Sequence, residues 1–378
     1  MPTTRSAERG DIKKVLLSSH YTMRVNFIIF LFIFAFVSCA TKVDEQTIFK
    51  DELICMSDDY TRTAISFDNT FTSSSDLGEC IIKDSLIFSI SRGEYLYHIS
   101  NLYSDELVAS LCKRGRATNE LITTLPLSEF FEINGQTCAN LFSFVENKLV
   151  LWNVDASLSE NKDIYESIVN LENVHLNSLM SLWRLDDSHL LAYNSYQDPN
   201  RMTNNDTPQY VEYNIETGQV IREFDIFNNV RFPESSIPEM SLLSNVDCIK
   251  PDRKQIAFAM SYMPVLNIMD IDSGKVHSYI LPDEKRLNLA IQRWCFADIV
   301  ADDEFIYALY SGEELYKGDG TDIPKVLYVF DWNGNIKTHA TLDDRFTLLH
   351  LENDVLFLTN PNGKIAEIKL SNLKFNDR

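Results

Sequence analysis

Residues 330–340 read FDWNGNIKTHA, in which an apolar strand, an acidic or Asn residue and a turn with glycine lead into a second apolar strand. Three other segments repeat this pattern: YNIETGQVIREF at residues 213–224, MDIDSGKVHSYI at 269–280 and TNPNGKIAEI at 359–368. Each segment predicts a β-hairpin, because glycine accepts the positive φ that tight turns require. Asn333-Gly334 and Asn362-Gly363 indicate type I′ turns, whereas the other two glycines fit a type I turn followed by a left-handed residue.

The spacing of these turns indicates the architecture. Gly218, Gly274 and Gly334 are 56 and 60 residues apart, a length that holds about four strands and is typical of a propeller blade. The residues from Ile48 to Leu373 divide into six units of about 54 residues, closer to these spacings than seven units. We therefore predict an all-β fold, a six-bladed β-propeller preceded by a signal peptide. The predicted blades are Leu77–Leu111, Gln136–Val169, Met180–Ile226, Leu242–Leu281, Trp294–Leu342 and Phe346–Leu370.

The two ends of the repeat are less regular. Gly363 follows Gly334 by only 29 residues, so its turn either belongs to a shorter blade or joins a different strand pair. The strand at Ile48–Met56 is expected to pair with the last blade and close the ring, which removes open sheet edges. Thr118–Phe131 and Leu176–Arg184 are ambiguous between helix and loop.

The stretch MRVNFIIFLFIFAFVSC, which ends at Cys39, predicts export. Arg24 precedes an apolar run of 11 residues, Phe27–Val37, which is too short for a membrane-spanning helix of about 20 residues. The residues before Cys39 resemble a bacterial lipobox, with Phe36 in place of the usual Leu. The resemblance implies cleavage before Cys39 and a diacylglycerol on its thiol. The alternative is an ordinary signal peptide that contains a cysteine.

These features divide the chain into five parts. Residues 1–22 are either a long n-region or an upstream extension from a misplaced start codon. Residues 23–38 are the lipoprotein signal peptide, 39–47 the lipid anchor and tether, 48–373 the propeller and 374–378 a C-terminal tail. Ala40 stands where an Asp would resemble an inner-membrane retention signal. We therefore expect attachment to the outer membrane, with the propeller facing the periplasm or the cell surface.

The charge of the chain restricts its partners. It holds 34 Lys and Arg against 55 Asp and Glu, a formal net charge of −21. This charge repels phosphate backbones, so we expect no nucleic-acid partner. It also repels anionic membrane surfaces, so membrane attachment is expected to come from the N-terminal lipid.

The sequence contains no complete catalytic or metal-binding motif. The seven histidines show no HExxH or HxxEH spacing, and no GxSxG, Walker or Rossmann glycine pattern appears. We predict no cofactor and no metal. Asp319 and Asp322 on a glycine-containing loop are a weak calcium candidate, for which a solvated loop is the favoured interpretation. Six cysteines besides Cys39 are widely spaced, and we favour free thiols over disulfides.

One loop stands out for its basic residues. Arg114 and Arg116 flank Gly115, and guanidinium groups bind anions and carboxylates with two parallel hydrogen bonds. Arg114, Arg116 and Glu120 are therefore a candidate ligand-binding loop. The favoured alternative is a surface loop in which the arginines pair with nearby acids such as Glu120.

Two segments also carry a family resemblance. They are Ile306–Gly312 with Val329–Asn335 near the C-terminus, and Lys113–Glu120, which follows the first blade. The chain resembles the TolB-like six-bladed β-propeller lipoproteins of Gram-negative anaerobes. Relatives often have a Gly-x-Gly-Pro-x-Glu loop at the second segment; here Gly115 and Glu120 are present, but Ala117 and Thr118 replace the second Gly and the Pro. The resemblance implies a fold and an envelope location, and no general activity.

Two functions follow as hypotheses. The first is a lipid-anchored cell-envelope binding module that recognises a protein, peptide or glycan through loops on one propeller face. The second is a propeller-fold enzyme, a lyase or hydrolase, with its site at the mouth of the central channel; its catalytic residues are not identifiable from the sequence. A structural role in a larger outer-membrane complex is a third, weaker hypothesis. We favour binding over catalysis.

Overall fold

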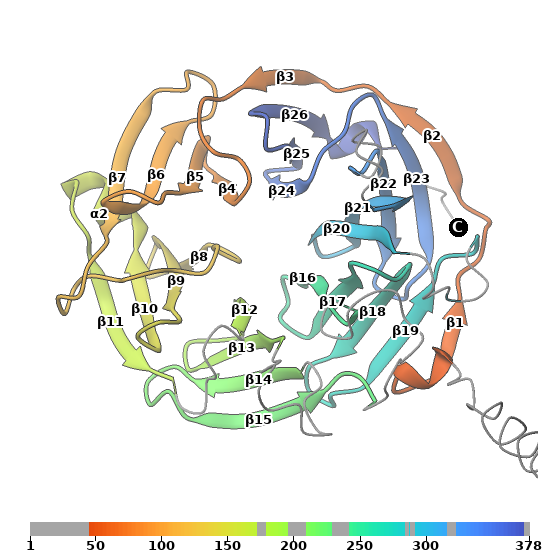
Figure 1. The fold of residues 1–378 in the computed structure, drawn as a ribbon, viewed down its shortest axis with the longest axis horizontal. Coiled ribbons are helices and arrows are strands. Elements are labelled where there is room, and N and C mark those ends of the chain that lie inside the picture. Colours follow the sequence, from red (N-terminus) through yellow and green to blue (C-terminus); the bar gives the residue numbers. More distant parts are fainter. Residues whose placement is uncertain are drawn as a thin grey trace, which may run out of the picture. The chain divides into compact units, whose positions relative to one another are not determined.

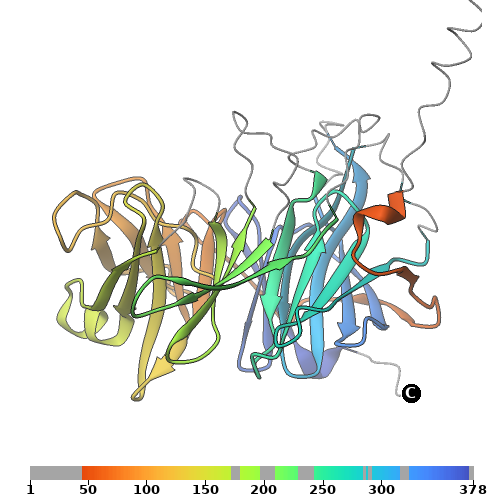
Figure 2. The ribbon, with the colours of Figure 1, turned by 90° about the horizontal axis from the view of Figure 1, so that it is seen from below.

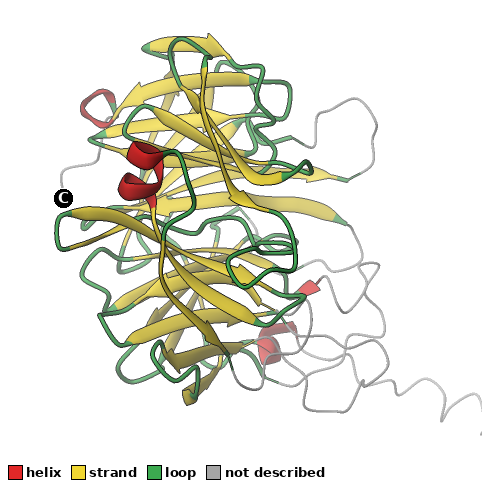
Figure 3. Cartoon of the chain, turned by 90° about the vertical axis from the view of Figure 1, so that its left-hand side faces the viewer, coloured by secondary structure: helices red, strands yellow, loops and turns green. Residues whose placement is uncertain are grey.

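The computed structural model describes residues 45–171, 179–195, 209–228, 242–283, 287, 292–315 and 323–373. Within the compact unit Glu45–Arg378, six sheets are arranged as the blades of a propeller (Figure 1). Strands make up nearly all of the regular structure (Figure 3). The six-bladed prediction is confirmed. No helix among the described residues is long and apolar enough to span a membrane.

Each of the first five blades contains four consecutive strands, from the centre outward. Blade 1 has β4 (Cys80–Lys83), β5 (Leu86–Ile90), β6 (Tyr95–Asn101) and β7 (Leu107–Lys113), and blade 2 has β8 (Phe131–Ile133), β9 (Gln136–Ser143), β10 (Lys148–Asn153) and β11 (Tyr165–Asn170). Blade 3 has β12 (Leu179–Arg184), β13 (His189–Asn194), β14 (Gln209–Asn214) and β15 (Val220–Asp225). Blade 4 has β16 (Asn245–Ile249), β17 (Gln255–Met260), β18 (Val265–Asp270) and β19 (Val276–Ile280), and blade 5 has β20 (Arg293–Ala301), β21 (Phe305–Glu314), β22 (Val326–Asp331) and β23 (Ile336–Leu342).

Blade 6 is built from both ends of the described chain. Its inner strands are β24 (Leu348–Glu352), β25 (Val355–Thr359) and β26 (Lys364–Lys369), and its outer strand is β3 (Asn69–Thr72). Gly363 therefore joins the second and third strands of a shorter blade, whereas the other turn glycines join the third and fourth. This arrangement explains the short final interval.

The ring closes through β3, and the prediction that Ile48–Met56 pairs with the last blade is wrong. Within that stretch, β1 (Leu53–Cys55) pairs in parallel with β19 of blade 4, and β2 (Thr61–Ile65) then pairs in parallel with β23 of blade 5. The sequence did not identify β3 as the closing strand, because β3 pairs with β26 through backbone groups and this pairing does not require an apolar sequence. The three N-terminal strands β1, β2 and β3 follow one another along the outer rim of the ring, each on a different blade, and appear in orange in Figure 1.

The predicted type I′ turns are also wrong. At Asn333-Gly334 and Asn362-Gly363 only the glycines have positive φ, +78° and +84°. The side chain of Asp331 accepts a hydrogen bond from the Asn333 N–H at 2.9 Å, and Asn360 accepts one from the Asn362 N–H at 3.0 Å. Such Asx turns favour a type I turn followed by a left-handed glycine.

One helix was not expected from the sequence. α2 (Val154–Glu160) follows β10; Asn153 caps its start by accepting from the Ala156 N–H, and Asn161 ends it at φ +50°. Short 3₁₀ turns lie at Glu45–Ile48 (η1) and Leu370–Asn372 (η2). The two ambiguous segments contain no described helix, since 118–130 is irregular and β12 occupies Leu179–Arg184.

Candidate functional site

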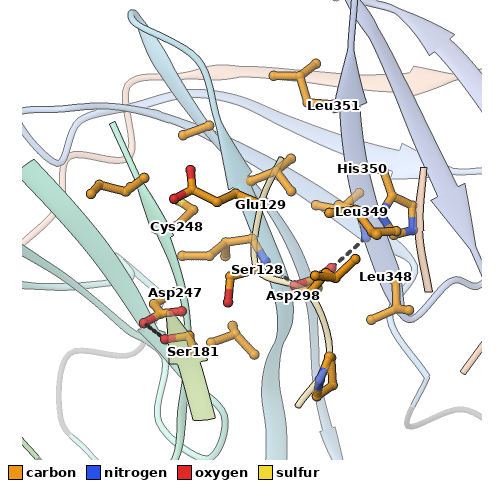
Figure 4. Close-up of a pocket in the computed structure, with 18 of the residues that line it drawn as sticks. Ser128, Glu129, Ser181, Asp247, Cys248, Asp298, Leu348, Leu349, His350 and Leu351 are labelled. Atoms are coloured by element: carbon orange, nitrogen blue, oxygen red, sulfur yellow. Dashed lines mark hydrogen bonds between the residues drawn. The ribbon is translucent and has the colours of Figure 1, made fainter. Parts of the chain in front are cut away.

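The inner strands of the blades surround a cavity of about 520 Å³ in the central channel (Figure 4). Five blades contribute their first strands, β4, β12, β16, β20 and β24. Blade 2 contributes the segment Pro126–Phe130, which precedes the short strand β8. Viewed from the side, the strands run between the two faces of the ring (Figure 2). All six blades therefore supply wall residues to one space.

β12 is an edge strand of blade 3, and the segment Pro126–Phe130 binds backbone N–H groups of this edge in place of a neighbouring strand. The Leu182 N–H donates to Ser128 Oγ at 2.9 Å, and the Arg184 N–H donates to Glu129 Oε1 at 2.6 Å. Arg253 donates to Glu129 Oε2 at 2.6 Å. Burial raises the pKa of Glu129, and the Arg253 charge opposes that rise. Side chains thus satisfy backbone donors that face the channel.

Two aspartates project from neighbouring inner strands. Asp247 of β16 accepts from Ser181 Oγ at 2.6 Å and from Tyr210 Oη at 2.8 Å, both through Oδ2. Asp298 of β20 accepts from the Leu349 N–H at 2.7 Å and from the Ile299 N–H at 3.0 Å. The Leu349 bond joins blades 5 and 6 (Figure 4).

The pKa values of both aspartates are raised. Burial raises the pKa of Asp247, and burial together with the charge of Asp247 raises the pKa of Asp298 to about 7, against hydrogen bonds from Leu349 and Ile299 that lower it. Both side chains keep part of their surface open to the cavity. Two coupled carboxylates, one of which titrates near neutral pH, therefore line the channel.

The basic residues of the wall are already paired. Arg253 binds Glu129 at 2.6 Å, and Lys83 of β4 binds Glu352 of β24 at 3.0 Å. Among the described residues, neither Asp247 nor Asp298 has a Lys, Arg or His within ion-pair distance. Acidic side chains without an ion-pair partner are therefore in excess at the cavity wall.

A thiol and an imidazole meet at the junction of blades 1 and 6. Cys80 Sγ lies 3.7 Å from His350 Nε2. Burial raises the pKa of Cys80 to about 12 and lowers the pKa of His350 to about 4. Both groups are therefore neutral at pH 7, the opposite of the thiolate and imidazolium that an activated cysteine nucleophile requires.

The predicted arginine loop lies elsewhere, between β7 and blade 2. Arg114 donates to the carbonyl oxygens of Gly93 at 3.0 Å, Ile122 at 2.6 Å and Ser91 at 2.7 Å. Its guanidinium is thus engaged by the backbone, while the side chain of Arg116 is exposed. The structure does not bring the two guanidinium groups together on a ligand, and anion binding here stays a prediction.

Glu120 folds back over the same loop. Its Oε2 accepts from the Ala117 N–H at 3.0 Å, and its Oε1 lies 3.6 Å from Lys113 Nζ. A Cβ at Gly115 would collide with the Glu120 carboxylate. Gly115 and Glu120 therefore form one compact turn, which leaves no room for a larger side chain at position 115.

The remaining predicted positions fall outside the described residues: Cys39, Asp319 and Asp322. In the described part of the chain, no three His, Cys, Asp or Glu side chains converge as a metal site. The six described cysteines are free.

The sequence analysis missed Asp247, Asp298 and Glu129. A usable signal existed for the first two. Each is a single carboxylate flanked by apolar residues in the first strand of a blade, as in VDCI (246–249) and ADIV (297–300). An isolated charge within an apolar strand is costly unless it faces a polar space.

Several solved structures are similar to this chain. The solved structure of a DUF4221-family protein from Bacteroides vulgatus is 11% identical, covers 85% of this chain and 98% of that chain, and has a TM-score of 0.50. A putative exported protein from Bacteroides fragilis is 12% identical, covers 84% and 86%, and has a TM-score of 0.45. BamB from Moraxella catarrhalis is 9% identical, covers 80% and 98%, and has a TM-score of 0.41.

At these identities the likeness to solved structures concerns the fold alone. No curated protein matches the sequence. The model of one family, described as TolB-like 6-blade propeller-like, matches residues 81–354. The chain belongs to this TolB-like six-bladed propeller family.

Proposed function

We propose that the protein is a lipid-anchored binding module of the outer membrane, which recognises a protein, peptide or glycan of the cell envelope at the mouth of its central channel. The observation that carries the proposal is the cavity of about 520 Å³ to which all six blades contribute. Rigid sheets hold its wall, so a ligand would meet preformed groups.

The location rests on the sequence around Cys39. Cys39→Ser is expected to move the protein from the membrane fraction to the soluble fraction of lysed cells, because one lipidated residue supplies the anchor. Mass spectrometry of the mature N-terminus measures the modification directly. Retention of the Cys39→Ser protein in the membrane would contradict lipid anchoring at this residue.

The binding site is tested by affinity capture from solubilised envelopes followed by mass spectrometry. Met180 lines the cavity and is 55% exposed, so Met180→Trp is expected to obstruct the mouth and abolish capture. Val145, in the turn after β9, is 46% exposed and lies off the cavity wall, so Val145→Trp is the matched control. Equal capture by both variants would rule out the channel mouth as the site.

A second candidate is an enzyme, a hydrolase or lyase, and one observation favours it. Asp298 has a pKa of about 7 and borders the cavity, which suits a general acid or base at neutral pH. Turnover of envelope glycans by the wild type, lost in Asp298→Asn, would support catalysis. Binding of a glycan without product would support the binding module.

A further inference from the structure

We propose that one particular face of the propeller lies against the bilayer that holds its lipid anchor. At this face the outer strand of each blade leads into the next blade, and we call it the connection face. The opposite face carries the turns between the first and second and between the third and fourth strands, and we call it the hairpin face. The inference rests on the proposed lipid anchor and names the surface that meets the membrane.

The first argument is the place at which the N-terminal segment joins the propeller. Ile48 and Phe49 are buried, and the Phe49 ring packs edge-to-face on Phe227 with 6.3 Å between centroids. Asn228 follows β15, where blade 3 leads into blade 4, and its side chain donates to the carbonyl oxygens of Thr47 at 3.0 Å and Phe49 at 2.7 Å. These contacts fix the segment at the connection face, and η1 appears in red near the upper face of the ring in Figure 2.

The length of the chain limits how far this point can lie from the lipid. Glu45, the first residue of η1, follows Cys39 by six residues, which span at most about 22 Å. The six residues of β18 alone span about 20 Å between the two faces. A bilayer at the hairpin face would require a fully extended chain running past the whole blade. A bilayer at the connection face requires no such extension.

The second argument is the charge of the hairpin face. Each blade exposes an acidic side chain there, and examples in order from blade 1 to blade 6 are Glu106, Glu160, Asp187, Asp272, Glu304 and Asp354. The exposed lysines described on this face offset only part of that charge; they are Lys162, Lys254, Lys275 and Lys369. An anionic lipid surface repels a face of this kind.

The connection face carries a more favourable set of charges. Arg92, in the turn after β5, and Arg116, in the arginine loop after β7, are both exposed there, next to the exposed Glu94. Guanidinium groups form paired hydrogen bonds with phosphate oxygens, which lipid headgroups supply. The face to which the N-terminal segment is fixed is therefore also the face with arginines available to the bilayer.

The cavity follows the same polarity. Met180 lies near the start of β12, at the connection end of the channel. The Lys83–Glu352 and Glu129–Arg253 ion pairs lie at the hairpin end, since Lys83 and Glu352 end their strands and Arg253 lies in the turn after β16. A ligand that enters past Met180 therefore comes from the membrane side.

The test is energy transfer from a fluorophore on the protein to an acceptor lipid in vesicles of phosphatidylethanolamine and phosphatidylglycerol. The full-length lipidated protein carries Cys55→Ser, because Cys55 is the exposed thiol of the described cysteines. Val145→Cys places the label in the turn between β9 and β10, on the connection face, and Leu107→Cys places it at the hairpin end of β7. We expect the Val145 label to lie about 20 Å nearer to the bilayer, the span of a six-residue strand.

Two controls complete the design. The Cys55→Ser protein without an added cysteine measures background labelling. Ile54→Cys, on β1 at the outer rim, is 43% exposed and reports a propeller that stands on its edge. In the expected arrangement the Ile54 label lies between the other two in distance from the bilayer.

Three results would overturn the inference while lipid anchoring stands: equal transfer from the Val145 and Leu107 labels, stronger transfer from Leu107, or strongest transfer from Ile54. The absence of transfer from every position would mean that the lipid does not hold the protein on the vesicle. That result would overturn the proposed anchor and the inference together, so the two failures are distinguishable.

Discussion

The arginine loop and the channel wall differ in the partners that their charged side chains have. In the loop, Arg114 gives its donors to three backbone carbonyls, and Glu120 accepts from the backbone beside Lys113. In the channel, Asp247 and Asp298 lack any basic partner among the described residues. The loop looks functional in the sequence, yet its charges are satisfied locally. The aspartates look like isolated strand residues, yet they line the cavity and accept hydrogen bonds without a basic partner in the described part of the chain.

The largest expected effect concerns Asp298. Its folded pKa of about 7 lies above its ordinary value of 3.8, so the native protein binds more protons than the unfolded chain between these values. The contribution of Asp298 to the free energy of unfolding therefore falls as pH rises through this window, by about 4 kcal/mol. In Asp298→Asn this contribution should vanish, so the difference between variant and wild type should change by that amount between pH 4 and pH 8. Urea unfolding measures it.

The comparison between variants is needed because His350 acts in the opposite direction. Its pKa falls from 6.5 to about 4 on folding, so its contribution to stability rises with pH between those values. This contribution is common to wild type and Asp298→Asn and cancels in the difference. A pH-independent difference between the two proteins would contradict the assigned shift of Asp298.

The second prediction addresses the loop. Arg114→Ala should lower the free energy of unfolding by about 3 kcal/mol, because three carbonyls lose a charged donor. Arg116→Ala, at an exposed position of the same loop, should change it by less than about 0.5 kcal/mol. Urea unfolding at pH 7 compares the two. If both variants are equally stable, Arg114 is not a structural residue, and its role in anion binding gains support.

Much of the fold could be predicted because it depends on local chemistry. The glycine turns fix hairpins, and their spacing fixes the blade. The closing strand of the ring could not be predicted because its pairing joins residues distant in sequence, whereas the turn type failed for a local reason. The outer strand of blade 6 is the polar segment Asn69–Thr72, whose pairing with β26 uses backbone groups that every sequence has. The turn type at Asn333-Gly334 failed because Asp331 competes for the backbone N–H groups.

The candidate site was harder to predict for a related reason. Asp247, Asp298 and Glu129 lie on three blades, and only closure of the ring brings them to one cavity. An inner-strand carboxylate is visible in the sequence, but its lack of a basic partner is a property of the assembled wall. Arg114 was also misjudged from the sequence. The three carbonyl groups that it binds belong to irregular backbone, which has no sequence signature.

The smallest expected effect compares two carboxyl groups directly. The Ala117 N–H, with a lesser contribution from Lys113, lowers the pKa of Glu120 below its ordinary value, whereas burial raises that of Asp298. NMR titration of side-chain carboxyl carbons should therefore show shifts of opposite sign in the two regions. Lys113→Met should return the pKa of Glu120 only part of the way, because the backbone donor remains. A complete return would mean that an exposed ion pair, rather than the turn over Gly115, holds this carboxylate. The contrast between a loop carboxylate held by a backbone donor and channel carboxylates raised in pKa by burial would then weaken.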